Sequence, residues 1–194
     1  MTDDGRRTTD DDDTEPTVPF ELQPTLIGSL VKLTPLRRDD YDALFAVASD
    51  PLIWEQHPNN DRYQPAVFQE FFRGALESGG AFLVTDATTG EAIGSSRFNG
   101  YDDAQREIEI GWTFLARARW GGAYNGEMKR LMLEHAFQFV DRVIFVIGER
   151  NVRSRRALEK IGGVLVDTRS EPGGQNRVVY AITQDVFRGR IGVT

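Results

Sequence analysis

Two hydrophobic periods alternate along the chain, and together they predict a fold that mixes strands and helices. Apolar residues recur every second position, or form short β-branched runs, over residues 26–36, 81–86, 91–101, 106–115, 142–147, 164–167 and 177–182. They recur at helical spacing over residues 38–48, 65–77, 124–140 and 152–161. The resulting order, β-α-α-β-β-β-α-β-α-β-β, predicts an α+β fold with a mixed sheet.

The strand predicted at residues 106–115 has two chemically different faces. Its apolar face carries Ile108, Ile110, Trp112 and Phe114. Its other face carries Glu107, Glu109, Gly111 and Thr113. Because side chains alternate along a strand, this pattern predicts an antiparallel sheet with one face covered.

Charge is unevenly distributed and separates a tail from a body. The net charge is −7, and the first nineteen residues carry −5 of it, so the rest of the chain is close to neutral. A polar, acidic segment cannot bury enough apolar surface to offset its chain entropy. We therefore predict a disordered acidic tail over residues 1–19 and a single domain over residues 20–194, a length that suits one hydrophobic core.

Composition excludes several classes of site and partner. The chain has no cysteine, which rules out disulfides, thiolate metal sites and cysteine nucleophiles, and its two histidines, His57 and His135, are isolated, so no metal is expected. No apolar stretch is long enough to span a bilayer, and the first residues do not resemble a secretory signal. We therefore expect a cytoplasmic protein without a membrane partner. The nearly neutral body argues against nucleic acid as a partner.

The glycine-rich segment Trp120-Gly-Gly-Ala-Tyr-Asn-Gly-Glu127 stands between a predicted strand and a predicted helix. Small residues there let backbone N–H groups approach an anion, and the helix start adds the positive end of its dipole, so the segment is typical of a phosphate site. Glu127 and Met128 stand where a P-loop requires Lys and Ser or Thr, and the spacing does not fit a dinucleotide-binding fingerprint. The alternative, that the glycines only form a tight turn, is equally consistent with this segment alone.

A second polar segment, residues 151–162, follows a buried strand. Arg153, Arg155 and Arg156 occupy the first turns of its predicted helix, where positive charge opposes the helix dipole and a bound anion would relieve the conflict. The alternative is a solvated basic face.

These two segments, in this order and after the Glu107-Ile-Glu-Ile-Gly-Trp112 strand, resemble the GNAT superfamily of acyl-CoA-dependent N-acetyltransferases, most closely its RimJ/RimL-like branch. The resemblance runs from about residue 26 to residue 182 and includes Leu33-Thr-Pro-Leu-Arg37, Asp50-Pro51 and the Asn-x-x-Ser run that begins at Asn151. It implies a GNAT-like, mostly antiparallel central sheet flanked by about four helices. It also implies an enzyme that moves an acetyl group from acetyl-CoA to a primary amine.

The resemblance further implies which residues hold coenzyme A. The family's pyrophosphate loop maps onto residues 118–123, and the usual Arg or Gln of its first position is Ala118 here, with Arg117 and Arg119 on either side. Asn151 matches the asparagine that bonds the pantetheine arm. The residues expected to bind the cofactor are Arg117, Arg119, Trp120, Gly121, Gly122, Ala123, Tyr124, Asn125, Gly126, Asn151, Ser154 and Arg156.

For catalysis, the resemblance implies that Glu109 is the base that takes the amine proton through water, and that Ser154 lies near the thioester sulfur. Glu107 shares the strand face of Glu109, and a like charge so close would raise the pKa of one carboxylate. The alternative is that both acids form a surface pair on the rim of the sheet. The tyrosine that often serves as general acid in the family is Leu158 here. Weaker candidates for that role are Tyr124 and Tyr180.

The acceptor site is expected in the loop after the first helix and on a neighbouring strand, because these face the thioester in the family. The expected substrate-binding residues are Trp54, His57, Tyr63, Arg97 and Glu107. Alternatively, Trp54 is a hydrophobic plug and His57 a structural group. The acceptor itself is expected to be an amine-bearing small molecule or a protein N-terminus.

Other interpretations of the sequence stay open. The side chains missing at Ala118 and Leu158 leave room for a non-catalytic acyl-CoA-binding or regulatory module. A nucleotide-dependent enzyme is disfavoured because the P-loop lysine is absent. The excess of arginine over lysine is typical of a GC-rich bacterial genome, and a homodimer is among the expected assemblies.

Overall fold

The computed structural model describes residues 19–170 and 176–191. The predicted acidic tail therefore lies, except for Pro19, outside the described residues. Phe20 is buried, and its ring packs edge-on against Phe98 with 5.2 Å between the ring centroids. The described chain thus joins the hydrophobic core from its first residues.

One mixed sheet of eight strands forms the centre of the described structure. The strands are ordered β1-β2-β3-β4-β5-β6-β8-β7, and every neighbouring pair is antiparallel except β5 and β6. The strands are β1 (Leu26–Ile27), β2 (Val31–Pro35), β3 (Ala81–Asp86), β4 (Ala92–Asp102), β5 (Glu107–Leu115), β6 (Arg142–Gly148), β7 (Val164–Ser170) and β8 (Asn176–Thr183). The mixed, mostly antiparallel sheet expected from the sequence is confirmed.

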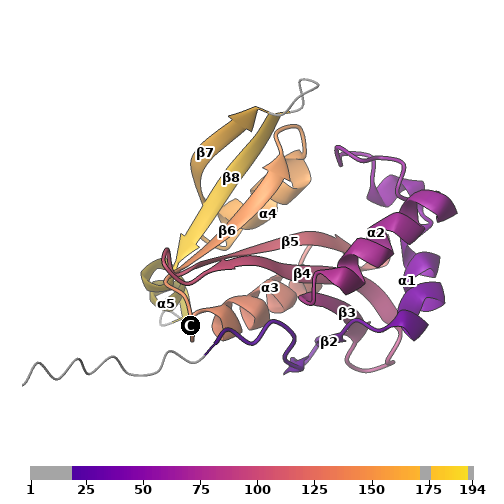
Figure 1. Ribbon diagram of the computed structural model, residues 1–194, viewed down its shortest axis with the longest axis horizontal. Helices are drawn as coiled ribbons and strands as arrows, with labels where there is room; N and C mark the ends of the chain where they lie inside the picture. The colour runs from indigo at the N-terminus through magenta and orange to yellow at the C-terminus, as the bar shows by residue number, and fades with distance from the viewer. Residues whose placement is uncertain (1–18, 171–175, 192–194) are drawn as a thin grey trace, which may run out of the picture.

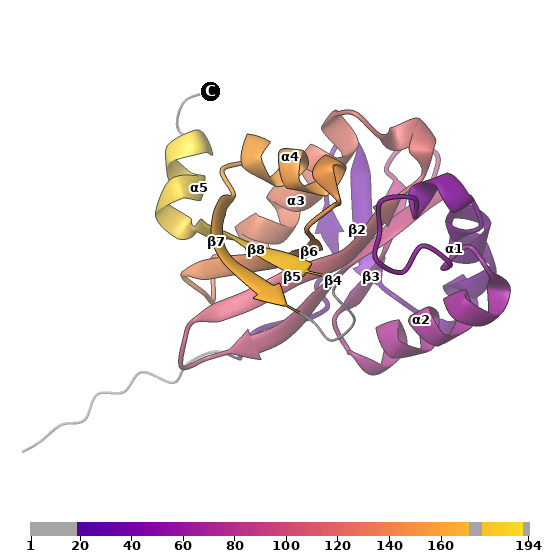
Figure 2. The same ribbon diagram turned by 90° about the horizontal axis from the view of Figure 1, so that it is seen from above.

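Helices cover both faces of this sheet. The α-helices of the described residues are α1 (Tyr41–Ala48), α2 (Pro65–Glu77), α3 (Ala123–Ala136), α4 (Val152–Lys160) and α5 (Gln184–Ile191), with short 3₁₀ turns at Arg38–Asp40, Pro51–Ile53 and Arg117–Arg119. Helices α1 and α2 lie on one face, whereas α3, α4 and α5 lie on the other (Figure 2). The expectation of a single covered face is therefore wrong, because a separate hydrophobic cluster forms on each side.

A bulge in β5 explains why both faces of this strand are apolar. Where β4 passes Ser96, two residues of β5 stand opposite one residue of β4. Trp112, in the bulge, has a φ of 50°, which is rare for a residue other than glycine. The extra residue reverses the alternation, so Ile108 and Ile110 pack with α3, whereas Phe114 packs with α1 and α2. The prediction that Ile108, Ile110, Trp112 and Phe114 share one face of the strand is therefore wrong from Trp112 onward.

The parallel strands β5 and β6 pair only over a short stretch and then separate. Their register runs from Glu107 opposite Arg142 to Glu109 opposite Ile144. Beyond that point β5 continues toward α1 and α2, whereas β6 turns away together with β8 and β7 (Figure 1). Because α3 follows β5 and α4 follows β6, both helices begin where the strands have separated.

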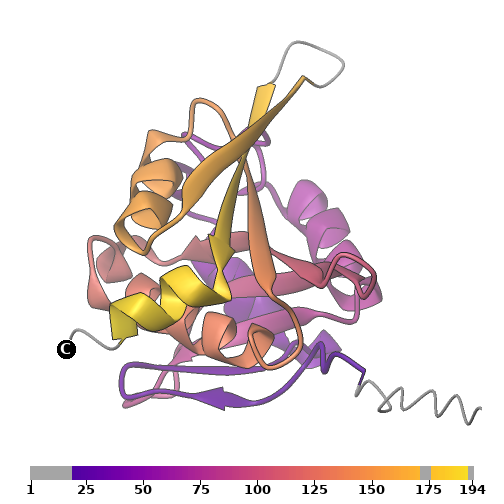
Figure 3. The ribbon, with the colours of Figure 1, turned by 90° about the vertical axis from the view of Figure 1, so that its left-hand side faces the viewer.

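Three smaller features differ from the sequence pattern. The extended segment expected over residues 26–36 is divided into β1 and β2 by a turn in which the amide of Gly28 donates to the carbonyl of Val31 at 2.9 Å. Helix α3 ends at Ala136 rather than at residue 140. Helix α5 was not expected. It follows the end of β8 (Figure 3) and packs Phe187 against Phe137, with ring centroids 5.2 Å apart. Among the described residues no helix is long and apolar enough to cross a membrane.

Candidate active site

A cavity of about 640 Å³ occupies the opening between β5 and β6. Its wall is formed by the separated parts of those strands, the first turns of α3 and α4, and the segment after Pro51–Ile53. Of the residues nominated by the sequence, the wall contains Trp54, His57, Trp120, Gly121, Gly122, Asn125, Gly126, Asn151, Ser154 and Arg156. Those outside the wall are Tyr63, Arg97, Glu107, Glu109, Arg117, Arg119, Ala123 and Tyr124. The structure thus brings most of the expected cofactor residues together.

The glycines at the start of α3 leave room for a ligand. A Cβ atom added at Gly121, Gly122 or Gly126 would find nothing within 4 Å beyond its own chain neighbours and helix. Gly121 has a φ of 85°, which favours glycine, but Gly122 is extended and Gly126 is helical. A tight turn therefore accounts for Gly121 only. The open space beside Gly122 and Gly126 favours a bound group instead.

Backbone donors converge on this space. The amide of Gly126 donates to the carbonyl of Gly122 at 3.3 Å, so the amides that precede it at the start of α3 have no acceptor inside the helix. The positive end of the helix dipole lies at the same place, and Arg156 contributes a guanidinium group to the cavity wall. This combination fits the pyrophosphate of coenzyme A.

Helix α4 begins with an asparagine cap at the cavity. Asn151 is buried, and its Oδ1 accepts a hydrogen bond from the amide of Ser154 at 3.1 Å, which fixes the first turn. Arg153 donates to the carbonyl of Ile53 at 3.0 Å and stacks over the ring of Trp120 at 3.8 Å. The stacking joins the start of α4 to the segment that leads into α3, across the opening.

Three residues expected to contact coenzyme A are bonded elsewhere. Arg117 forms an ion pair with Asp50. Arg119 Nη2 lies 3.0 Å from Asp86 Oδ2, and the hydroxyl of Tyr124 donates to the same oxygen at 3.0 Å. The structure therefore does not place either arginine as a replacement for the Arg or Gln that the family loop usually has.

Glu127 is not part of the cavity wall, and hydrogen bonds from the β1–β2 turn stabilise its negative charge. Its carboxylate accepts the hydroxyl of Ser29 at 2.6 Å and the amides of Ser29, Leu30 and Val31 at 3.0, 2.6 and 2.9 Å. Burial alone would raise the pKa of Glu127, but these hydrogen bonds outweigh it and lower the pKa to about 2. An acidic residue inside the glycine-rich segment is therefore compatible with a phosphate site.

Glu109 lies at the edge of the cavity. It occupies the last paired position of β5 before the strands separate. Its Oε1 is 3.0 Å from the position that a Cβ would take on Gly111, a residue of the cavity wall. Burial raises the pKa of Glu109, and the charges of Arg169 and Arg177 offset part of that effect. A buried carboxylate with a raised pKa is suited to accept a proton.

Glu107 has a different environment. Its Oε2 lies 3.2 Å from Nε of Arg142 on the neighbouring strand, in a partly exposed ion pair. Burial, rather than the charge of Glu107, is what raises the pKa of Glu109. The two acids thus have different surroundings although they share one strand.

The expected acceptor residues of the loop after α1 are in three different environments. Trp54 is buried and its Nε1 donates to the carbonyl of Ala48 at 2.7 Å, although one side of it reaches the cavity wall. His57 accepts the amide of Asn59 at 3.0 Å, and burial together with the charge of Arg62 lowers its pKa to about 3, so the imidazole is neutral at physiological pH. Tyr63 is exposed and stands outside the wall.

The sequence reasoning overlooked Lys129, which lies in the wall of the cavity. Its Nζ donates to Oγ1 of Thr113 at 2.7 Å, lies 3.4 Å from Oγ of Ser96, and faces the ring of Phe145 at 5.4 Å. Burial lowers the pKa of Lys129 to about 7. The spacing in the sequence could have indicated its burial, because Lys129 precedes the buried Leu133 and Ala136 by four and seven positions, which places it on the same helix face.

The structure shows the surroundings of Tyr180 and Leu158, two positions considered for a general acid. The hydroxyl of Tyr180 donates to Glu159 at 2.8 Å and accepts from Arg155 at 3.1 Å, and Tyr180 is not in the cavity wall. Leu158 is in the wall, where the family often has a tyrosine. The described residues contain no group of His, Cys, Asp and Glu side chains suited to hold a metal ion.

Comparisons with known proteins identify the family. The family model of the acetyltransferase (GNAT) domain matches residues 31–164. A putative acetyltransferase from T. thermophilus is 26% identical, with a TM-score of 0.72 over 88% of this chain and 95% of that chain. RimJ from Mycobacterium smegmatis, solved with CoA-disulfide, is 20% identical, with a TM-score of 0.66 over 87% of this chain and 92% of that chain. No protein with a curated description matches the chain.

A spermidine N-acetyltransferase from Vibrio cholerae, solved with CoA and spermine, is 16% identical, with a TM-score of 0.65 over 83% of this chain and 99% of that chain. Such distant structures share the fold. The family model, in contrast, spans most of the chain, from β2 to the start of β7, and so includes both strands that separate and both helices that begin at the cavity. The chain therefore belongs to the GNAT family of acetyltransferases and resembles its RimJ/RimL-like members.

Proposed function

We propose that the protein transfers an acetyl group from acetyl-CoA to a primary amine by direct attack within a ternary complex. The observation that carries this proposal is the cavity between two separated strands, with an open glycine cradle in its wall and Glu109 at its edge. Acetyl-CoA, when bound, supplies the thioester whose carbonyl carbon the amine attacks.

Binding is assigned to backbone groups more than to side chains. The amides at the start of α3, from Gly122 to Asn125, hold the pyrophosphate together with Arg156. Beyond Glu109 and Ile144, the facing backbone groups of β5 and β6 are no longer paired with each other, and the backbone amide of Val146 donates to Glu109. We assign the remaining facing groups to an extended arm that lies between the strands. The pantetheine arm has amide groups that suit this role.

Proton transfer is assigned to Glu109. As the N–C bond forms and the C–S bond breaks, one proton leaves the amine and passes through water to the carboxylate, while the sulfur leaves with the electron pair of the broken bond. Ser154 is the hydroxyl of the cavity wall proposed to donate to that sulfur. Because a thiolate is a tolerable leaving group, the reaction does not depend on a tyrosine at Leu158. Positioning of the reactants supplies the largest part of the acceleration.

The cofactor assignment is tested by ligand-induced thermal stabilisation with acetyl-CoA, free CoA, ATP and NADH. A ligand that binds only the folded state raises the melting temperature, so the two CoA species are expected to raise it and the other two are not. Gly126→Val fills the open space beside α3 and is expected to abolish the shift. Gly74→Val is the matched control, because Gly74 is also a helical glycine with open space around it but lies on α2. If neither CoA species stabilises the protein, the cavity does not bind coenzyme A and the proposal fails.

The competing function is a module that binds acyl-CoA without turnover, favoured by Leu158 at the tyrosine position. Glu109→Gln separates the two. In an enzyme this variant keeps the thermal shift with acetyl-CoA and lowers thiol release in the presence of an amine by about 10²–10³-fold. Stabilisation by acetyl-CoA without amine-dependent thiol release from the wild type would support the binding module.

A further inference from the structure

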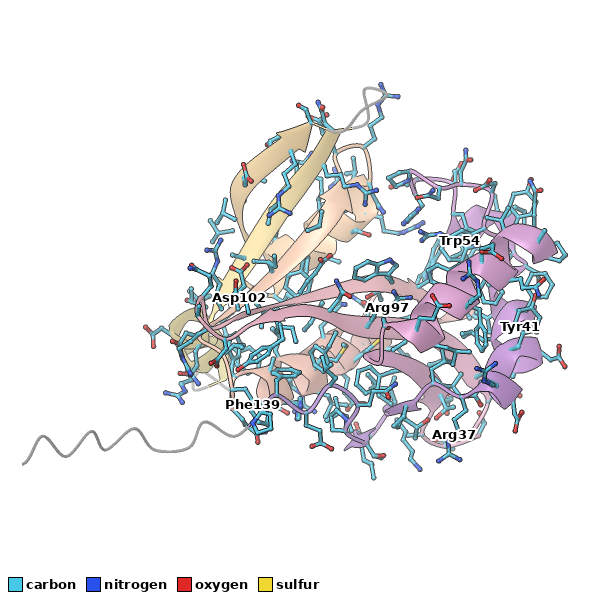
Figure 4. All side chains as sticks on the ribbon, viewed as in Figure 1. Arg37, Tyr41, Trp54, Arg97, Asp102 and Phe139 are labelled. Atoms are coloured by element: carbon cyan, nitrogen blue, oxygen red, sulfur yellow. The ribbon has the colours of Figure 1, made fainter. Side chains whose placement is uncertain are left out.

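Positive charge gathers beside Glu109, on the face of the sheet that α2 covers. Arg97 stands on β4 directly opposite Gly111, so its side chain emerges on the same face as that cavity residue. Figure 4 shows Arg97 and Trp54 on the half of the molecule that carries α1 and α2. Arg97 and Glu109 therefore flank Gly111, one from the neighbouring strand and one along β5.

Arg97 is buried with a hydrogen-bonding group that the described structure does not use. It is only 7% exposed, and its guanidinium group lies between the rings of Trp112, at 4.6 Å, and Phe71, at 5.9 Å. Its Nε has no hydrogen-bond partner among the described residues. A buried guanidinium nitrogen without an acceptor is costly, and such groups normally bind an anion or a carbonyl.

Arg62 also approaches the ring of Phe71. Its guanidinium lies 4.5 Å from the centre of Phe71 and 5.5 Å from that of Trp54, and its Nη1 is 3.2 Å from Nε2 of His57. Burial, together with the charges of Arg97 and Arg177, lowers the pKa of Arg62 to about 10. Arg62 and Arg97 are thus close enough to repel each other.

In the described part of the chain, Arg62 and Arg97 are not held in ion pairs with carboxylates. Arg97 senses the charge of Glu109, and Arg62 that of Asp61. Glu109 itself is surrounded by Arg97, Arg169 and Arg177. A polyamine would meet repulsion at this surface, whereas an amine that also carries a negative group would complete it.

We propose that the acceptor is an amine that bears an anionic group, a carboxylate or a phosphate, and that Arg97 and Arg62 bind this group while Glu109 receives the proton of the amine. The inference rests on the proposed acetyl transfer and names the class of its acceptor. The planar fork of a guanidinium matches both anions, and the two arginines on Phe71 set the position of the anion relative to Glu109.

The experiment compares amine acceptors with and without an anionic group. Thiol release from acetyl-CoA is measured with β-alanine against β-alaninamide, with 2-aminoethyl phosphate against ethanolamine, and with 1,3-diaminopropane as a dication. We expect kcat/KM to be at least about 10-fold higher for the member of each pair that carries the anionic group than for its partner without one, with the dication poorest. The first pair identifies a carboxylate site and the second a phosphate site.

Variants link the preference to the arginines. Arg97→Gln is expected to reduce the ratio of kcat/KM with the anionic group to kcat/KM without it by about 10–100-fold, and Arg62→Gln, which does not disturb a strand, is expected to reduce it in the same direction. Arg73→Gln is the matched control, because it removes an exposed charge from α2 near Phe71 and is expected to keep the wild-type ratio. Arg97→Lys, which keeps the charge, should restore part of the preference.

The outcomes separate this inference from the proposed function. Transfer to the amines without an anionic group, the dication included, as fast as to those with one would overturn the inference and leave acetyl transfer intact. Absence of thiol release with every amine would count against acetyl transfer. In that case binding is measured by titration calorimetry of β-alanine and 2-aminoethyl phosphate into the CoA-saturated protein. The anion site predicts binding heat in the wild type that Arg97→Gln abolishes. If the wild type gives no heat, or if Arg97→Gln gives the same heat, the anion site is overturned.

Discussion

Lys129 is a buried amine whose position carries an electrostatic cost. It is buried at the bulge of β5, where the hydroxyls of Thr113 and Ser96 accept from its amine. Among the described residues it has no acidic partner within ion-pair distance. Hydroxyl groups and an aromatic face solvate an ammonium less well than water does, so the neutral amine is favoured.

Replacing Lys129 by methionine is therefore expected to stabilise the protein at neutral pH. Methionine has a similar shape and needs no solvation, and Thr113 keeps a hydroxyl partner because its Oγ1 lies 2.8 Å from Oγ of Ser96. We expect the free energy of unfolding at pH 7 to rise by about 1–4 kcal/mol. Urea denaturation measures it, and Lys32→Met on the exposed side of β2 is the control, with a change within about 0.5 kcal/mol.

The same pair of proteins gives a prediction for pH. The folded pKa of Lys129, about 7, is below its unfolded value of about 10.4, so between these values the unfolded state binds more protons. The wild type should therefore gain stability, relative to Lys129→Met, as the pH rises from about 7 toward 10, and the advantage of methionine should shrink. A constant difference over this range would mean that the buried amine is not held neutral.

At the scale of elements, the order from β2 to β8 could be predicted because most of these elements have one apolar face, whereas β1 as a separate strand and α5 could not. The bulge in β5 could not be predicted, because it depends on how β4 and β5 align and no residue of the strand marks it. As a consequence of the bulge, Ile110 and Phe114 belong to the two hydrophobic clusters on opposite faces of the sheet. The starts of α3 and α4 follow local motifs, so most of the residues that they contribute to the cavity wall could be predicted. Arg62 was missed because it lies in a loop without a motif and meets Arg97 only through the fold.

Besides its apolar packing, the start of helix α3 is bonded to the edge of the sheet by the carboxylate of Glu127. Glu127 accepts four hydrogen bonds from residues 29–31, and Gly28 allows the close approach, since a Cβ there would stand 2.4 Å from Oε2. The bonds position the start of α3, and with it the glycine cradle. The element that forms the proposed phosphate site is thus held from the side opposite to the ligand.

Glu127→Gln is expected to lower the free energy of unfolding by about 2–3 kcal/mol at pH 7, because an amide cannot accept all four bonds. Since the folded pKa, about 2, is below the usual 4.5, this contribution is complete above about pH 4.5 and is lost as the pH falls toward 2. Urea denaturation at pH 7 and at pH 3 measures both effects. Glu134→Gln, which removes a surface partner of Arg130 on the same helix, should change stability by less than about 0.5 kcal/mol at either pH. Equal effects of the two substitutions would contradict the stabilising role of the hydrogen bonds that Glu127 accepts.

At the scale of the whole molecule, the sheet consists of two groups of strands joined over a short parallel register. Strands β1–β5 form one group and β6–β8 the other, and only residues 107–109 and 142–144 pair across the junction. Each group contributes the start of one helix to the cavity, α3 from the first and α4 from the second (Figure 1). A ligand in the cavity would therefore contact both groups and add to the few bonds that hold them together.

Coenzyme A is accordingly expected to protect both groups from hydrogen exchange at once. Amides at the start of α3, residues 122–126, and at the start of α4, residues 152–156, should exchange at least about 10-fold more slowly with saturating CoA, because opening either helix start would break contacts with the ligand. Mass spectrometry of peptic fragments measures both regions in one experiment. Gly126→Val should remove the protection at α3 and, with it, the protection at α4, whereas Gly74→Val should leave both. Protection confined to α3 would show that the ligand binds the helix start without bridging the separated strands, and the proposed position of the pantetheine arm would then be wrong.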